Sequence, residues 1–229
     1  MDTNLSSFSR LARERRTSKI LANNGDPVEH SAEVVQRNDQ LVWRAIADAG
    51  FAPFHYDRGL NDVVEPWRFH ILWQDDCRYI SSHLADWFDD MKPSNKLPAM
   101  LAACGCLVLV NWIPQFRIQN LENLETPEKQ LQVDEEHLAA TGAATQNLLL
   151  SLTACGLRTY WSSGGFFRTA EMFERLEIPS SERLLSAIFV DYGAADDAVA
   201  VIAGKHADAR SDPKKWTREI DLGPLRSSD

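Results

Sequence analysis

Apolar residues recur at helical spacing in several stretches of the first half of the chain. One stretch runs from about residue 5 to residue 21, and the NNGDP turn at 23–27 ends it. Ser31 is a typical N-cap for a second helix, which Gly50 ends. A third amphipathic stretch runs from about 76 to 91. The pattern therefore predicts helices over these three segments.

Other segments have the spacing and composition of strands. Residues 67–73 alternate aromatic or aliphatic residues with polar ones, and 184–193 is rich in β-branched and aromatic residues. Residues 105–113 form a continuous apolar run, which fits a central strand buried on both faces. Residues 51–66 predict a long irregular loop, and the polar stretch 114–132 predicts a surface excursion or lid.

The longest predicted helix opens at Asp134 and ends at Gly156. It carries a cluster of small residues: Ala139, Ala140, Gly142, Ala143 and Ala144. Small side chains let another helix approach closely, so this is either a central core helix or a helix that packs against its symmetry mate in a dimer. Because helices and strands are interleaved, the pattern predicts an α+β or α/β layered domain.

The composition narrows the functional classes. The 229 residues carry a net charge of −9, which disfavours a general nucleic-acid surface. The sequence shows neither a signal peptide nor an apolar run long enough to cross a membrane, so a cytoplasmic protein with no membrane segment is expected. The four cysteines lie in or beside apolar segments and are expected to be reduced.

Several catalytic signatures are absent from the sequence. There is no GxGxxG after a strand, no GxxxxGK[ST] and no HExxH, and Trp161 stands where GxSxG would need a glycine. The six histidines are scattered, so no metal site is expected.

Three features remain, and they occur in a fixed order. Residues 14–19, ERRTSK, form a basic island in an acidic chain, a Pro-His loop precedes Pro66-Trp67, and a Gly- and Ser-rich turn follows Tyr160. In this order they resemble the FMN-dependent nitroreductase family from about Ser9 to Gly193. The segment 15–19 is similar to the family's Arg-Arg-Ser-x-Arg/Lys signature, and 51–55 to its Ala-Pro-x-His loop. Residues 66–69 look like its Gln-Pro-Trp-x-Phe motif, and 161–164 like its Trp-x-Ser-Gly turn.

The resemblance implies a cofactor site. Arg15 and Thr17 would meet the FMN phosphate with Arg16 beside them, and Lys19 would approach the pyrimidine edge of the flavin. His55 would reach FMN bound to the other subunit. The turn Trp161, Ser162, Ser163 and Gly164 would lie beside the isoalloxazine. A basic residue of the C-terminal tail commonly joins the phosphate, here Arg210 or Lys205, with Arg210 preferred.

Each piece also has a plainer interpretation. The basic island would suit an exposed helix end facing the last carbonyl groups. His55 could simply hydrogen-bond a backbone carbonyl. Trp161 could be a core aromatic that precedes an ordinary turn.

The resemblance further implies a nitroreductase-like α+β fold of three layers, with a central mixed sheet and a long central helix at a homodimer interface. The chain 1–229 would be a single FMN-binding domain, in which the loop 54–66 and the excursion 114–132 shape the substrate pocket or act as a lid. NADH or NADPH would pass hydride to FMN, and an organic acceptor such as a nitroaromatic, quinone or enone would then be reduced in a ping-pong cycle.

Two departures from the family pattern concern the substrate pocket. The segment between His55 and Pro66 is longer than usual, and Glu65 stands where glutamine is common.

The alternatives to a reductase are a flavin carrier or sensor without turnover, and a non-flavin interaction protein on the same fold.

Overall fold

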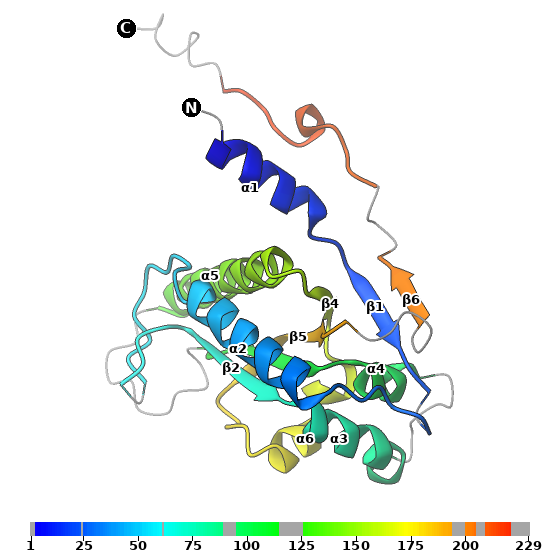
Figure 1. Cartoon of the computed structure of the whole chain (residues 1–229). Coiled ribbons are helices and arrows are strands. Elements are labelled where there is room, and N and C mark those ends of the chain that lie inside the picture. The colour runs from blue at the N-terminus through cyan, green and yellow to red at the C-terminus, as the bar shows by residue number, and fades with distance from the viewer. Residues whose placement is uncertain are drawn as a thin grey trace, which may run out of the picture.

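An antiparallel sheet lies at the centre of the molecule, with strand order β2-β3-β5-β4 (Figure 1). Its strands are β2 (Trp67–Leu72), β3 (Cys106–Trp112), β5 (Arg183–Asp191) and β4 (Arg158–Ser162). The computed structural model describes residues 3–23, 25–60, 62–88, 95–114, 126–193, 200–204 and 209–220. All seven residues of β3 are buried, which confirms the predicted central strand.

Helices cover both faces of this sheet. On one face, α2 (Ala32–Ala49) and α5 (Pro127–Ala154) pack on the β3 and β5 side chains that point to that face, including Val108 and Ile188. On the other face α3 (Gln74–Trp87) and α4 (Leu97–Ala103) pack on residues such as Leu109 and Phe189, and α6 (Ala170–Arg175) joins them through Met172. The three-layer α+β fold expected from the sequence is confirmed (Figure 1), but the described strand pairs of the central sheet are all antiparallel and not mixed as expected.

The N-terminal segment differs from the prediction of one helix from 5 to 21. Helix α1 spans Thr3–Glu14, and Ser18–Leu21 form strand β1, which pairs antiparallel with β6 (Ala200–Ala203). Thr17 also forms a parallel bridge with Thr159 of β4. The prediction was wrong here because β1 gains its hydrogen bonds from a distant part of the chain, which helical periodicity cannot reveal. The basic island therefore joins a helix to a strand and is not a helix end.

The predicted long helix is present, but it begins earlier than the sequence pattern indicated. α5 begins at Pro127 after the N-cap Thr126, whose side chain accepts a hydrogen bond from the Lys129 amide at 3.4 Å. The acidic run from Asp134 therefore lies inside the helix, because a Thr-Pro start already provides the cap and the preset φ angle. Gly156, with φ of +80°, follows its last turn as expected. Of the predicted excursion, residues 115–125 lie outside the described part.

Two shorter elements were also missed. Residues 158–162, for which the sequence pattern predicted no strand, form β4, and β6 lies near the C-terminal tail. By contrast, the N-cap Ser31 and the end of α2 at Gly50 are as predicted. Short 3₁₀ helices, η2 (Gly165–Arg168) and η4 (Pro213–Lys215), complete the described elements.

The described residues 51–60 and 62–66 form neither helix nor strand, in agreement with the predicted loop. The four cysteines are free thiols, with three buried and Cys155 partly exposed. No helix in the described part of the chain has the length and apolar character needed to span a bilayer.

Candidate functional site

A cavity of about 400 Å³ opens where β1 and β6 meet the edge of the sheet. Five of the predicted cofactor residues line it together: Arg15, Arg16, Thr17, Lys19 and Arg210. The first three lie between α1 and β1, Lys19 lies on β1, and Arg210 comes from the C-terminal segment. The volume is in the range of small-molecule sites. The fold thus brings the basic island and the predicted tail arginine to one place.

Backbone contacts hold Thr17 in this cavity. The Gly204 amide donates to the Thr17 carbonyl at 3.0 Å, and Thr17 bridges to Thr159 of β4. A Cβ atom added to Gly204 would lie 3.0 Å from the Thr17 Cβ, so a larger residue would push the two segments apart. Gly204 therefore allows β6 to close tightly over the basic island.

Two further side chains in the cavity wall were not predicted as site residues. Lys96, just before α4, adds a cation, and Tyr160 of β4 lies beneath Lys19, whose Nζ is 4.7 Å from the ring centroid. Tyr160 adjoins a predicted motif, which was a partial signal. Nothing in the sequence near Lys96 marks it as part of the site, because it reaches the cavity only through the packing of α4 on β1.

The charge in the cavity is positive. Among the described residues that line it, five are arginine or lysine and none is acidic. Burial, followed by the nearby charges of Arg210 and Arg16, lowers the pKa of Arg15. Guanidinium groups that repel one another in this way are stabilised by a bound anion, and their planar forks suit phosphate oxygens.

The predicted turn at 161–164 follows Tyr160 directly. Gly164 has φ of +105°, and a Cβ there would lie 2.3 Å from Leu184 Cδ2, so this position requires glycine. The Gly164 amide donates to Ser162 Oγ at 3.2 Å. Trp161 is 38% exposed, which contradicts its interpretation as a core aromatic. The turn thus presents an exposed aromatic ring on a backbone that requires glycine at position 164.

His55 lies elsewhere. It lines a separate hollow of about 400 Å³ with Pro53, Phe54 and Glu136, and with the small residues Ala139, Ala140 and Ala143 of α5. Among the described residues its ring forms no hydrogen bond, and its aromatic neighbour is Tyr56, with ring centroids 4.6 Å apart. The alternative in which His55 hydrogen-bonds a backbone carbonyl is therefore not seen. Within one chain, His55 and the basic cavity are separate sites.

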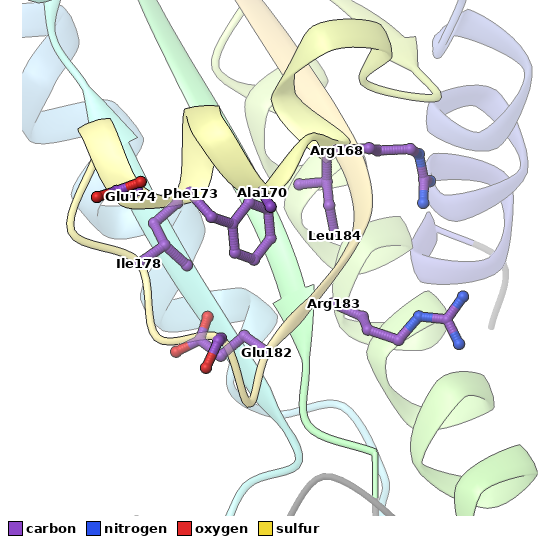
Figure 2. A pocket seen from close by; sticks show the side chains of 9 residues that line it. Arg168, Ala170, Phe173, Glu174, Ile178, Glu182, Arg183 and Leu184 are labelled. Carbon is purple, nitrogen blue, oxygen red and sulfur yellow. The ribbon is translucent and has the colours of Figure 1, made fainter.

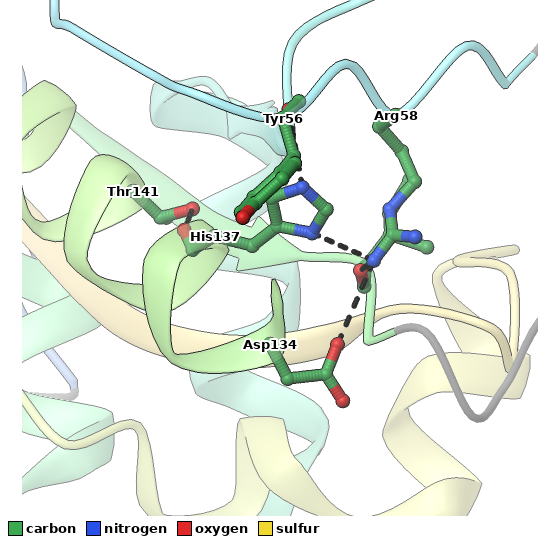
Figure 3. A network of polar contacts seen from close by, with 6 residues as sticks. Tyr56, Arg58, Asp134, His137 and Thr141 are labelled. Atoms are coloured by element: carbon green, nitrogen blue, oxygen red, sulfur yellow. Dashed lines mark hydrogen bonds and ion pairs between the residues drawn. The ribbon is translucent and has the colours of Figure 1, made fainter. Parts of the chain in front are cut away.

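A buried polar cluster anchors the same loop to α5 (Figure 3). Arg58 donates to the Ile113 carbonyl and to His137 Nδ1, the latter at 2.8 Å, and lies 3.7 Å from Asp134. The other ring nitrogen of His137, Nε2, donates a hydrogen bond to the Tyr56 carbonyl at 3.1 Å. Sequence reasoning missed this cluster, because its members are joined only when the loop folds against α5.

The pKa values in this cluster reflect burial and charge. Burial lowers the pKa of Arg58 to about 10, against the raising effect of Asp134. Burial and the neighbouring Arg58 lower the pKa of His137 to about 4. His137 is therefore neutral at ordinary pH, and its Nδ1 accepts a hydrogen bond from the charged Arg58 guanidinium.

No group of three or more potential metal ligands occurs within the described ranges.

The family model "Nitroreductase family" matches residues 12–193, well over half of the 229-residue chain. The chain belongs to the nitroreductase family. Membership of this family implies an oxidoreductase. A search of curated protein sequences gave no significant match.

Solved structures of nitroreductases share the fold. A nitroreductase-like family protein from Bacillus cereus is 17% identical with a TM-score of 0.60, covering 93% of this chain and 95% of that one. A putative nitroreductase from Desulfovibrio desulfuricans, solved in complex with FMN, is 18% identical with a TM-score of 0.53, covering 93% and 96%. The FMN-dependent nitroreductase NfnB from Mycobacterium smegmatis, in complex with NADPH, is 14% identical with a TM-score of 0.53, covering 95% and 100%.

Proposed function

We propose that this nitroreductase-family chain is an FMN-dependent oxidoreductase, folded as a single domain over residues 1–229, that uses NAD(P)H to reduce an organic acceptor. The observation that carries the proposal is the convergence of Arg15, Arg16, Thr17, Lys19 and Arg210 on one cavity, whose described lining residues include no acidic side chain. FMN is the cofactor whose combination of a phosphate and a polar ring edge matches this set.

The phosphate would lie among Arg15, Arg16, Arg210 and the Thr17 hydroxyl. Three guanidinium groups lie among the described lining residues, the charges of Arg210 and Arg16 lower the pKa of Arg15, and a phosphate dianion would offset this repulsion. The hydrogen bond from the Gly204 amide to the Thr17 carbonyl fixes the backbone of Thr17 at this end of the cavity. These features support the fit of this end to a phosphate group.

The ring system would extend past Lys19 toward the turn Trp161, Ser162, Ser163 and Gly164. Lys19 is held over the face of Tyr160, so its ammonium group is placed beside the cavity before any ligand arrives. Gly164 gives this turn a backbone conformation, with φ of +105°, that L side chains rarely adopt. When bound, FMN supplies the hydride acceptor and donor, and the side chains named here supply binding and charge.

A homodimer would complete the site, with His55 reaching the cofactor of the partner. In support, His55 and Ala139 lie in one hollow on the outer side of α5. Large apolar residues are also uncovered on α1 and on the C-terminal segment, namely Leu5, Phe8, Trp216 and Ile220, which are each more than half exposed. In Figure 1 both segments project from the layered body, a position that suits a second copy.

The reductant and acceptor follow from the family. The NADPH complex of NfnB supports a nicotinamide nucleotide as the reductant. The acceptor classes proposed are nitroaromatics, quinones and enones. In the ping-pong cycle the nucleotide gives up its hydride first, and the acceptor is reduced afterwards. The loop 54–66 would shape their pocket, because Arg58 ties it to α5 and so restricts its movement.

The test is to titrate the purified full-length protein with FMN and to follow flavin absorbance and the melting temperature, then to supply NADPH or NADH with a nitroaromatic acceptor. Saturable FMN binding that raises the melting temperature, with acceptor-dependent oxidation of the nucleotide, is the expected result. FMN binding without turnover would favour a flavin carrier or sensor. A protein that cannot be loaded with FMN would favour an interaction protein on the same fold.

A further inference from the structure

A second hollow, of about 460 Å³, lies at the start of β5, between η2, α6 and the loop that follows α6 (Figure 2). Phe173, Ile178 and Leu184 give it an apolar wall. Arg168 and Arg183 lie on one side of it, and Glu174 and Glu182 lie on the opposite side in Figure 2. The hollow thus has an apolar middle, a basic end and an acidic end.

The basic end is connected to the proposed flavin turn. Arg168 Nε donates to the Ser163 carbonyl, and its Nη2 donates to the Leu185 carbonyl at 2.8 Å. A Cβ added to Gly164 would lie 3.5 Å from Arg168 Cγ. Arg168 therefore touches both the turn and β5, so a ligand held at this end lies next to the segment proposed to bind the flavin.

Arg183 complements Arg168. It is paired across the sheet with Trp112, and its guanidinium carbon lies 5.8 Å from the centroid of that ring. Within the described part of the chain neither arginine forms an ion pair with a carboxylate. Burial and the charge of Arg183 lower the pKa of Arg168, which fits two cations close enough to repel each other. An aromatic ring and carbonyl groups therefore orient the basic end, and no described carboxylate forms an ion pair with it.

The acidic end does not neutralise it. The Glu182 carboxylate is buried and accepts hydrogen bonds from His70 Nε2 at 2.7 Å and from Asn111 Nδ2 at 2.8 Å. These contacts join Glu182 to β2 and β3, and in Figure 2 it lies across the hollow from the two arginines. An anionic ligand group would therefore be attracted to Arg168 and Arg183 with its apolar body against the Phe173 and Leu184 side chains.

We propose that Arg168 and Arg183 form a subsite for an anionic group, a carboxylate or a phosphate, on the small molecule that reacts beside the turn 161–164. The inference rests on the proposed function and narrows its substrate class. The group belongs either to an acceptor that carries a carboxylate on a flat apolar body or to the additional phosphate of NADPH. Arg183 supplies the main contact, because two nitrogens of Arg168 already donate to backbone carbonyls.

The experiment uses the FMN-loaded protein and two pairs of probes that differ chiefly in charge: para-nitrobenzoate against para-nitrobenzamide, and NADPH against NADH. Binding is measured by calorimetry, and KM and kcat by steady-state kinetics. In Arg183→Gln, the charged member of one pair should bind about tenfold more weakly, as expected for loss of a hydrogen bond between charged groups. The neutral amide and NADH should change little, and kcat should stay close to its original value.

The control is Arg175→Gln. Arg175 is an exposed arginine of α6 that pairs with Glu171 at 2.8 Å and does not line the hollow. Arg175→Gln should leave the affinities for the members of both probe pairs unchanged. The pair in which Arg183→Gln acts identifies the source of the anion: the benzoate pair indicates an acceptor carboxylate, and the nucleotide pair indicates the phosphate of NADPH.

Equal effects of Arg183→Gln on the charged and neutral members of both pairs, or no effect on either, would overturn the subsite. This failure is distinct from failure of the proposed function, because FMN loading is measured separately. If FMN does not bind, calorimetry with both probe pairs on the purified chain still tests the subsite. Selective weakening of para-nitrobenzoate or of NADPH by Arg183→Gln would support it, and indifference of both would reject it.

Discussion

Arg15 and Arg58 are both partly removed from water, and burial lowers the pKa of both, but they have opposite neighbours. The charges nearest to Arg15 are those of Arg210 and Arg16. Arg58 is held by the Ile113 carbonyl, by His137 and by Asp134. The first arginine lines an open cavity, and the side chain of the second is almost completely buried.

The difference separates two uses of one residue type. A buried arginine whose partners all come from the protein contributes to the fold, because its removal leaves those partners unsatisfied. An arginine surrounded by other cations at a cavity is strained in the absence of an anion, and this arrangement indicates a ligand. Arg15 and Arg58 should therefore respond oppositely when stability and FMN binding are measured in the same variants.

The largest effect is expected for Arg58→Met. It leaves Asp134 and His137 without their buried partner and should lower the free energy of unfolding by about 3 kcal/mol. Urea denaturation measures this. The matched control is Arg44→Met on the exposed side of α2, which should change stability by less than about 0.5 kcal/mol. Equal losses in both variants would show that Arg58 is not a structural anchor.

Acidification tests the same cluster without a substitution. The folded state holds the pKa of His137 near 4, below its ordinary value of 6.5, so folding favours the neutral ring. Between these values the unfolded chain binds a proton that the folded chain does not, so this stability is complete above pH 6.5 and is lost as the pH falls toward 4. The loss should approach about 3 kcal/mol. In His137→Gln the free energy of unfolding should depend less on pH in this range. An unchanged slope would show that other groups cause the pH dependence.

For the basic cavity, Arg15→Gln should act on binding and not on folding. Loss of a charged contact to phosphate should weaken FMN about 30-fold, or by about 2 kcal/mol, while the melting temperature without FMN stays the same or rises slightly. Equilibrium titration of flavin fluorescence measures the affinity. Arg13→Gln, in the last turn of α1 and outside the cavity lining, is the control and should bind FMN normally. A similar loss of FMN affinity in both variants would show that the net charge of the protein, and not a contact of Arg15, determines the affinity.

The smallest effect is expected for Lys96→Gln. Lys96 lines the cavity but is exposed, so solvent screens its charge. FMN affinity should fall about threefold, and the fall should disappear at high salt. A salt-independent loss as large as that of Arg15→Gln would instead place Lys96 in direct contact with the phosphate.

Local signals accounted for much of the site. Arg15 to Lys19 are consecutive in the chain, so the motif was visible in the sequence, and the turn at 161–164 was visible for the same reason. Gly204, Lys96 and Tyr160 join the cavity only because β6 pairs with β1 and α4 packs beside them. Nothing in their own neighbourhoods reports that pairing, since it depends on contacts between distant parts of the chain.

By itself the sequence determined the helical and strand character of α2, β2, β3, α5 and β5, because periodicity, caps and continuous apolar runs are local properties. It also determined the resemblance to the nitroreductase family, which rests on short motifs in order. Only the tertiary structure decided that 18–21 is a strand, that Arg210 meets the basic island, and that Arg58 is an anchor. The reason is common to all three: each depends on partners far away in the chain, and hydrogen bonds and charge contacts of that kind exist only once the chain has folded.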